Sequence, residues 1–353
     1  MTDAILTLLM KFIRDFQNLL SGASSTDADW DAFIASWPDH VDRFSKELGR
    51  RIPDEEMAAF LSSLMIPIIR NGFVSGERKE ELFDRLQALG AHFSPVHFYS
   101  PVPDTTSLPD ELWDRRYDTT PGWSLREADQ LALLAKLAPY AEELKHIDAF
   151  DWKNPQFNET DASVYYAMIR HFGPSKVLEV GAGYSTCIAG QAALRNGHTI
   201  LNAIEPYPAR FLTRGVPGLS QLIREPAQSV PIETFTELDA GDFLFIDSTH
   251  VCKIGSDVTY LILEILPRLR PGVVVHIHDI FLPWNMPKEW VKRRHLFWNE
   301  QYLLLAFLQG NRDFEVLLAT HYLGVCHPNN LKRAFPNLAT KGGGSFWIRR
   351  LSR

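Results

Sequence analysis

Hydrophobic and polar positions follow a helical period over the first part of the chain. Between residues 1 and about 93, apolar residues recur every three or four positions in segments at 5–20, 28–48, 54–71 and 77–89. Ser, Gly and Pro separate these segments, and neither strand alternation nor a chemical motif is found among them. The pattern predicts an all-helical N-terminal extension over residues 1–93, which we interpret as a lid for the domain that follows.

The first segment, MTDAILTLLMKFIRDFQNLL, is apolar enough to suggest a targeting signal. Asp3 stands where a signal peptide carries basic residues, and Lys11 and Arg14 interrupt the apolar run. The spacing is that of an amphipathic helix, packed or lying on a membrane surface, and we favour the packed helix. The chain has no run of about 18 apolar residues, so no transmembrane helix is predicted.

Residues 94–124 are rich in Pro and aromatic residues. This segment is too irregular for a helix or strand and too apolar for a free linker, so we expect it to pack over the following domain. A helix is predicted from Ser124, which we place at its N-cap, and another from Asp161, again as the N-cap, to Gly173.

After Asp161 the pattern changes to alternating strands and helices. Repeated β–α units predict an α/β fold, a Rossmann-like, mostly parallel sheet with helices on both faces, over residues 94–353. The expected strands are 176–180, 200–206, 219–225, 242–248, 273–279, 314–323 and a short one at the C-terminus, with helices at 184–194, 257–269 and 299–309 between them.

Charge and cysteine content bear on the binding partners and on the cellular compartment. Charged residues make up 22% and the net charge is −7, which gives no support for binding to nucleic acid or to an acidic membrane. Three cysteines, at widely separated positions 187, 252 and 326, form neither a disulfide framework nor a zinc motif. We therefore expect a reducing, cytoplasmic setting.

The stretch VLEVGAGYST (177–186) carries the strongest chemical signal. A buried strand runs into a turn with Gly181 and Gly183 and then into a helix whose first N–H groups are free for a ligand. Glu205 ends the next strand, where an acid can bind both hydroxyls of a ribose. The dinucleotide motif fits less well, because its third glycine is replaced by Thr186. Glu179 before the turn would repel a pyrophosphate but suits an ammonium group, which points to S-adenosylmethionine.

These residues resemble a known family. EVGAGYST, Glu205, DFLFIDSTH and VVVHIHDIF are similar to class I S-adenosylmethionine-dependent methyltransferases. More narrowly, HFYSPVPD, YYAMIRHFGPSKVLEVGAGYST, FIDSTHVCKIGSDV, HIHDIFLPW and WNEQYLLLAFL resemble a bacterial group found in polysaccharide and secondary-metabolite gene clusters. The resemblance covers roughly residues 96–323 and implies a seven-stranded sheet with an antiparallel last hairpin.

The resemblance also assigns cofactor contacts. Gly181 and Gly183 would line the methionine portion of S-adenosylmethionine, Glu179 would contact its amino group directly or through water, and Glu205 would bind the ribose. Ser185 and Thr186 would bind its carboxylate or cap the helix, and we rank capping first. Ala227 and Gln228 are weak candidates for contacts with the adenine. Asp247, which ends the fourth strand, would lie beside the sulfonium, with Ser248 as a further cofactor contact.

Polar residues at the ends of two later strands are the candidates for catalysis. Asp247, His250, His278 and Asp279 are expected at the carboxyl edge of the sheet, where such folds bind ligands. Three interpretations stay open: His250 or His278 as general base, a divalent metal held by Asp247, His278 and Asp279, or hydrogen bonding of loops alone. The metal is not favoured, and His276 is expected to be a satisfied core histidine.

Two further groups of residues have competing interpretations. Aromatic or polar side chains can form the wall of the pocket, although core packing is the more common role for each. The basic run KEWVKRRH (288–295) faces either an acidic substrate or solvent, and we favour a solvated helix face. The wall candidates are Tyr99, Trp123, Trp152, Asn154, Tyr165 and Tyr184.

The predicted function is methyl transfer from S-adenosylmethionine to a hydroxyl of a small-molecule or sugar-like acceptor in polysaccharide or secondary-metabolite biosynthesis. An alternative is cyclisation of S-adenosylmethionine alone to azetidine-2-carboxylate and methylthioadenosine, for which Asn154, Tyr184 and Ser248 would supply polar groups. A third hypothesis is that the chain is a non-catalytic binding protein that has kept the fold. The sequence does not determine the acceptor or the oligomeric state.

Overall fold

The computed structural model describes residues 96–148, 150–338 and 342–352, together with Asp84, Gln87, Ala88 and His92. The chain divides into two compact units, Met1–Pro101 and Val102–Arg353. The helices expected at 5–20, 28–48 and 54–71, and with them the lid interpretation, lie outside the described residues. In the segment expected at 77–89, the three described residues, Asp84, Gln87 and Ala88, are helical.

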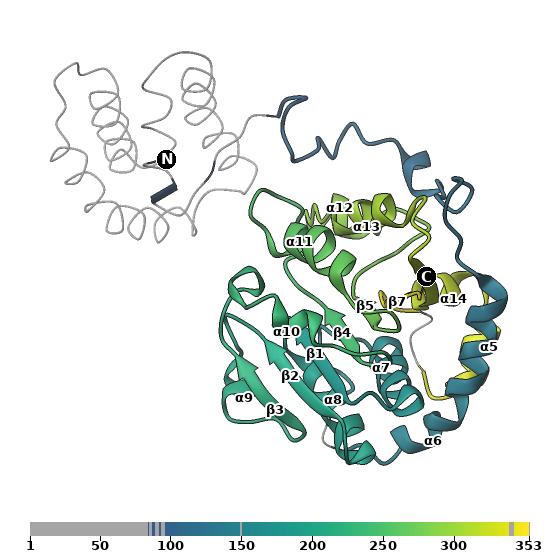
Figure 1. Ribbon diagram of the computed structural model, residues 1–353. Helices are drawn as coiled ribbons and strands as arrows, with labels where there is room; N and C mark the ends of the chain where they lie inside the picture. Colours follow the sequence, from purple (N-terminus) through teal and green to yellow (C-terminus); the bar gives the residue numbers. More distant parts are fainter. Residues whose placement is uncertain are drawn as a thin grey trace, which may run out of the picture. The chain divides into compact units, whose positions relative to one another are not determined.

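The second unit alternates strands and helices as the hydrophobic pattern predicts (Figure 1). Its strands are β1 Lys176–Val180, β2 Ile200–Ile204, β3 Leu219–Ile223, β4 Phe243–Ile246, β5 Val274–Ile277, β6 Phe314–Ala319 and β7 Phe346–Arg350. Its helices are α5 Glu127–Leu137, α6 Ala141–Leu144, α7 Glu159–Phe172, α8 Tyr184–Asn196, α9 Arg210–Thr213, α10 Glu233–Thr236, α11 Asp257–Tyr260, α12 Lys288–Lys292, α13 Glu300–Leu308, α14 Thr320–Cys326 and α15 Pro328–Ala334. Among the described residues, no helix is long and apolar enough to cross a membrane.

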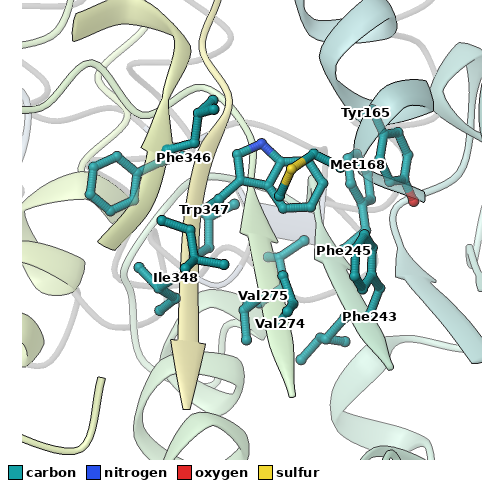
Figure 2. Packing of buried hydrophobic residues seen from close by; sticks show 14 of the residues in the cluster. Tyr165, Met168, Phe243, Phe245, Val274, Val275, Phe346, Trp347 and Ile348 are labelled. Carbon is teal, nitrogen blue, oxygen red and sulfur yellow. The ribbon is translucent and has the colours of Figure 1, made fainter. Parts of the chain in front are cut away.

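The strands form one seven-stranded sheet in the order β3-β2-β1-β4-β5-β7-β6. Neighbouring strands from β3 to β5 are parallel, whereas β7 runs antiparallel to both β5 and β6. The Rossmann-like α/β fold with an antiparallel last hairpin is therefore confirmed. Helix α7 lies on one face of the sheet, where Tyr165 and Met168 pack near Phe243, Phe245 and Trp347 (Figure 2).

His276 belongs to this aromatic layer, but it is not the satisfied core histidine that we expected. Its ring is fully buried and stacks on Trp347, with 4.0 Å between the ring centroids. Neither ring nitrogen has a hydrogen-bond partner among the residues that the structure describes. Burial lowers the pKa of His276 well below its ordinary value, so the ring is neutral and packs as an aromatic side chain.

The register of the sheet determines which residues meet at its carboxyl edge. Ile204, Val180, Ile246 and Ile277 are consecutive partners across β2, β1, β4 and β5. Because parallel strands in register end together, the residues that follow them form a row. That row consists of Glu205, Gly181, Asp247 and His278. The antiparallel strand β7 brings Ser345 to the same edge, since Phe346 is the partner of Ile277.

Three local predictions were wrong. Helix α7 starts at Glu159, and its N-cap is Asn158, whose side chain accepts from the backbone N–H groups of Thr160 and Asp161. Helix α5 starts at Glu127; the Ser124 hydroxyl accepts from the N–H of Arg126, before the helix, and does not cap it. The strand expected over 314–323 ends at Ala319, where its pairing with β7 ends, and α14 follows.

The aromatic segment after residue 101 packs over the domain, as predicted. Trp113 donates through Nε1 to the carbonyl of Met286 at 2.9 Å, and the N–H of Tyr117 donates to the carbonyl of Pro283 at 2.8 Å. These bonds attach the segment to the chain that follows β5. The expected packing is thus confirmed for residues 102–124.

Candidate active site

The turn between β1 and α8 depends on two glycines for different reasons. Gly181 has a φ of +84°, and a Cβ there would overlap the carbonyl oxygen of Asp247. This close approach lets the β1 and β4 ends lie against each other, with the Asp247 N–H donating to Val180 at 2.8 Å. A Cβ on Gly183 would meet nothing within 4 Å, so its backbone borders open space.

The two acids around this turn have different surroundings. Glu205 is half-buried, and its carboxylate accepts from the N–H groups of Ala182 at 3.3 Å and Tyr207 at 2.8 Å. Glu179 is fully buried beneath the turn and accepts from the Tyr165 hydroxyl at 3.0 Å. Burial raises the pKa of Glu179 to about 8, although hydrogen bonds from Thr186 and Tyr165 oppose that shift.

Asp247, His250 and Asp279 form a compact cluster after the ends of β4 and β5. His250 Nε2 lies 3.2 Å from Asp247 Oδ1 and 3.8 Å from Asp279 Oδ2, while its Nδ1 lies 3.0 Å from the buried carboxylate of Glu300. His250 and Asp279 both have left-handed backbones, with φ of 60° and 58°. Such conformations are strained for residues with a Cβ and are concentrated at functional sites.

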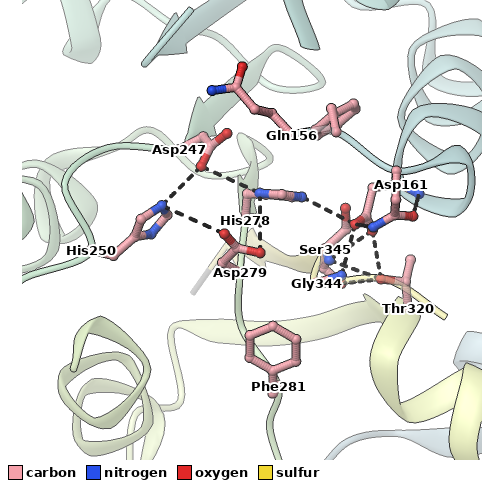
Figure 3. A network of polar contacts seen from close by, with 12 residues as sticks. Gln156, Asp161, Asp247, His250, His278, Asp279, Phe281, Thr320, Gly344 and Ser345 are labelled. Atoms are coloured by element: carbon pink, nitrogen blue, oxygen red, sulfur yellow. Dashed lines mark hydrogen bonds and ion pairs between the residues drawn. The ribbon is translucent and has the colours of Figure 1, made fainter. Parts of the chain in front are cut away.

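His278 is held between this cluster and Asp161 (Figure 3). Its Nε2 donates to Asp161 Oδ2 at 3.2 Å, and its Nδ1 lies 3.4 Å from Asp247 Oδ1 and 3.6 Å from Asp279 Oδ1. Asp161 is completely buried and also accepts from the N–H groups of Gly344 at 2.8 Å and Ser345 at 3.0 Å. The network therefore joins the start of α7, the end of β5 and the start of β7.

These carboxylates raise the pKa of both imidazoles. Burial alone would lower the pKa of His250, but hydrogen bonds with Asp247 and Glu300 outweigh burial and raise it to about 10. Burial also opposes charge on His278, yet the charges of Asp279 and Asp247 and the bond to Asp161 raise its pKa well above the ordinary value. The surrounding carboxylates therefore favour the charged form of both imidazoles.

A cavity of about 520 Å³ lies in front of this edge of the sheet. Most of the residues that the sequence placed in the site line it, namely Asn154, Gly181, Gly183, Tyr184, Ser185, Glu205, Asp247, His250, His278 and Asp279. Its volume is typical of a small-molecule site. Three of the expected residues do not line the cavity. Glu179 lies beneath the turn, and Gln228 is exposed and donates to the carbonyl of Gly255. Ser248 has a buried hydroxyl that finds no partner among the described residues.

The remaining wall candidates are mostly elsewhere. Tyr165 is core, and neither Trp123 nor Trp152 lines the cavity. Tyr99 belongs to the first unit and is 82% exposed. Asn154 does line the cavity, but its amide is bound to the loop around it: the nitrogen donates to the carbonyls of Asp151 and Phe157, and the oxygen accepts from two backbone N–H groups.

Sequence reasoning missed the residues that support the cluster. Asp161 was assigned to a helix cap, and Glu300 was not singled out at all. A buried acid at the start of the very apolar helix α13 was a usable signal, since an acid there needs a partner. Trp290 and Trp298 also line the cavity and were not among the wall candidates.

The residues best placed to hold a metal differ from those expected. Ligand atoms of Asp247, His250 and Asp279 all lie within 4.8 Å of one another. This set contains His250 in the place that the sequence analysis gave to His278. Two carboxylates and one imidazole suit a divalent ion of intermediate softness.

Comparison with known proteins agrees with this geometry. A family model described as a methyltransferase domain matches residues 178–280, which run from within β1 to just beyond β5. An uncharacterized protein of Archaeoglobus fulgidus is 30% identical over 173 residues, covering 43% of this chain and 76% of that protein.

Two solved structures are also similar. The plantazolicin methyltransferase BpumL, in complex with a triazolic desmethylPZN analog and SAH, has a TM-score of 0.37 and 14% identity over 65% of this chain and all of that one (100%). The O-methyltransferase from Bacillus cereus in complex with SAH has a TM-score of 0.32 and 15% identity over 63% of this chain and 91% of that one.

The sheet order, the Gly turn and the acid after β2 define a Rossmann-like domain of the methyltransferase class. The chain belongs to the class I S-adenosylmethionine-dependent methyltransferases.

Proposed function

We propose that the protein transfers the methyl group of S-adenosylmethionine to a hydroxyl of a small-molecule or sugar-like acceptor in polysaccharide or secondary-metabolite biosynthesis. One observation carries the proposal: a single cavity is lined both by the Gly turn with Glu205 and by the cluster of Asp247, His250 and Asp279. The first group suits the methyl donor, and the second suits an acceptor that must lose a proton.

The residues present fit S-adenosylmethionine. Gly183 borders open space, so a ligand can approach its backbone, and the first N–H groups of the 13-residue helix α8 suit the methionine carboxylate. Glu205 lines the same cavity and would accept the ribose hydroxyls. Glu179 is fully buried and is not among the residues that line the cavity, so we assign it a role through the turn above it. Adenine contacts by Ala227 and Gln228 have the weakest support.

The transfer is a substitution at the methyl carbon. A lone pair of the acceptor oxygen forms the new C–O bond, the C–S bond breaks, and its electron pair stays on sulfur as the neutral thioether of adenosylhomocysteine. We assign the acceptor's proton to Asp279. Its carboxylate lies 3.6 and 3.8 Å from the two imidazoles, whereas Asp247 lies closer to both, at 3.2 and 3.4 Å. Asp279 therefore interacts more weakly with the imidazoles than Asp247 does, and is the better placed of the two carboxylates to accept a proton.

A divalent ion also fits the cluster of Asp247, His250 and Asp279. An ion there would lower the pKa of the acceptor hydroxyl and orient it. The chain's own part in either case is to hold the two carboxylates at one wall of the cavity. Turnover that persists in the presence of a chelator would assign proton transfer to Asp279 alone.

The test is to incubate the purified full chain with S-adenosylmethionine, with and without a panel of hydroxylated acceptors, and to analyse the nucleoside products. We expect adenosylhomocysteine to form only when an acceptor is present. Methylthioadenosine formed without any acceptor would establish cyclisation instead. If calorimetry detects no binding of S-adenosylmethionine, both reactions are eliminated and the hypothesis of a non-catalytic binding protein remains.

A matched pair of variants links the activity to the site. Asp279→Asn removes the proposed proton acceptor and should lower the rate at least about a hundredfold, which is a typical contribution of general base catalysis. Asp239→Asn changes an exposed acid that pairs with Arg270 at the opposite end of the sheet, and it should leave the rate unchanged. Equal rates for the two variants would remove Asp279 from the mechanism.

A further inference from the structure

The basic run at residues 288–295 does not form one solvated face. Lys288 pairs with Asp110 at 2.8 Å, and Lys292 donates to the carbonyl of Leu108 at 3.0 Å, so both hold the segment that precedes α5. Arg293 is exposed and lies 4.0 Å from Glu289 on its own helical segment. Arg294 differs from these three because it lines the cavity of the active site.

The guanidinium of Arg294 has no carboxylate partner among the described residues. Its Cζ lies 5.8 Å from the centroid of the Trp290 ring, which is within range of a cation–π contact. A guanidinium over an aromatic ring keeps the N–H donors at its edge available. Arg294 is itself exposed, and at the cavity wall it presents a cation that has no carboxylate partner among the described residues.

The wall around Arg294 is apolar and leads to the reacting cluster. Leu296, Trp290 and Trp298 line the cavity with it. Trp298 packs on His250 with 4.3 Å between the ring centroids, and Trp290 packs edge-on against Trp298 at 5.4 Å. This wall thus connects the unpaired guanidinium to the cluster where the acceptor hydroxyl reacts, along a surface suited to a ring.

We propose that Arg294 recognises an anionic group of the acceptor, so that the substrate is a hydroxylated compound with a carboxylate or phosphate on a ring that packs against Trp298. This inference rests on the proposed function. A carboxylate or phosphate matches the edge of a guanidinium in geometry and charge. The carboxylate of S-adenosylmethionine is the competing anion, but the N–H groups at the start of α8 are available for it on the other part of the cavity wall.

The experiment uses the full chain saturated with adenosylhomocysteine, so that only the acceptor subsite is open. Calorimetry compares salicylate with salicylamide, and glucuronate with glucose, as charged and uncharged partners of similar shape. We expect at least one acid to bind about tenfold or more tightly than its neutral partner, as a charge-assisted hydrogen bond provides. Arg294→Gln should abolish this preference, and Arg293→Gln, a neighbouring cation that is not among the residues lining the cavity, should retain it.

Three results would overturn the inference. They are equal binding of acids and neutral partners by the unmodified chain, absence of any acid binding, and a preference that persists in Arg294→Gln. Weaker adenosylhomocysteine binding by Arg294→Gln would also overturn it, because the arginine would then hold the methionine carboxylate. Failure of the proposed function has a different signature: the unmodified chain would not bind S-adenosylmethionine or would not form adenosylhomocysteine with any acceptor.

Discussion

Asp161 accepts a hydrogen bond from Nε2 of His278 at 3.2 Å, between residues 117 positions apart in the chain. The bond fixes which nitrogen of the ring faces the cavity, because Nε2 is occupied and Nδ1 points to Asp247 and Asp279. Asp161 thus positions His278 from behind without reaching the cavity itself.

We predict that Asp161→Asn destabilises the fold by about 3 kcal/mol, because an amide cannot accept all the donors that a buried carboxylate accepts. These donors include the N–H groups of Gly344 and Ser345 and the hydroxyl of Thr320. Urea unfolding measures the change. Asp129→Asn, an exposed acid that pairs with Arg126, should cost less than about 0.5 kcal/mol. Similar losses in both variants would contradict a special role for Asp161.

The raised pKa of His250 predicts a fall in stability at alkaline pH. The group gains affinity for its proton on folding, so its contribution is complete below the ordinary value of 6.5 and is lost as pH rises toward about 10. Asp247, Asp279 and Glu300 are the acids that face it. Denaturant unfolding between these pH values should show a shallower decline for His250→Asn than for the unmodified chain. His295→Asn, an exposed histidine, should keep the original slope.

The two glycines of the turn should respond differently to the same substitution. Gly181→Ala places a Cβ against the carbonyl of Asp247 at a φ of +84°, so we expect a loss of about 2 kcal/mol or more in stability. Gly183→Ala meets no protein atom within 4 Å and should unfold at nearly the original denaturant concentration. Its methyl group would instead border the cavity and weaken adenosylhomocysteine binding by calorimetry. Equal stability of the two variants would refute the packing argument.

Glu205 gives a test of the donor subsite alone. We expect Glu205→Gln to weaken adenosylhomocysteine binding about tenfold, because an amide replaces a charged acceptor of the ribose hydroxyls. Glu225→Gln, an exposed acid two residues beyond β3, is the matched control and should bind normally. An unchanged affinity in Glu205→Gln would remove this residue from the ribose site.

The sequence was sufficient to predict the edge of the sheet but not the support behind it. Glu205, Gly181, Asp247 and His278 each follow a recognisable buried strand, and parallel strands in register bring such positions together. Asp161 could not be placed in the same way. Its contact with His278 depends on how α7 packs beside the sheet, which no short-range pattern encodes.

Local propensity also failed where pairing partners decide the structure. The residues after Ala319 are compatible with a strand, but the partner of Ala319 is Phe346, the first residue of β7, so the ladder between the two strands ends there. The chain turns into α14 instead. The basic run at 288–295 shows the same limit, because only the fold separates Arg294 from the neighbouring cations that point elsewhere.

The position of β7 between β5 and β6 has a consequence for the order of folding. Among the described residues, strand β6 pairs only with β7, so its backbone has no partner in the sheet until residues 346–350 are synthesised and inserted. The same insertion delivers the N–H groups of Gly344 and Ser345 to Asp161. On a ribosome, where N-terminal parts emerge first, we expect the methyl-donor half of the sheet to form early, and the support of His278 to be completed in a late step that also adds β6 to the sheet.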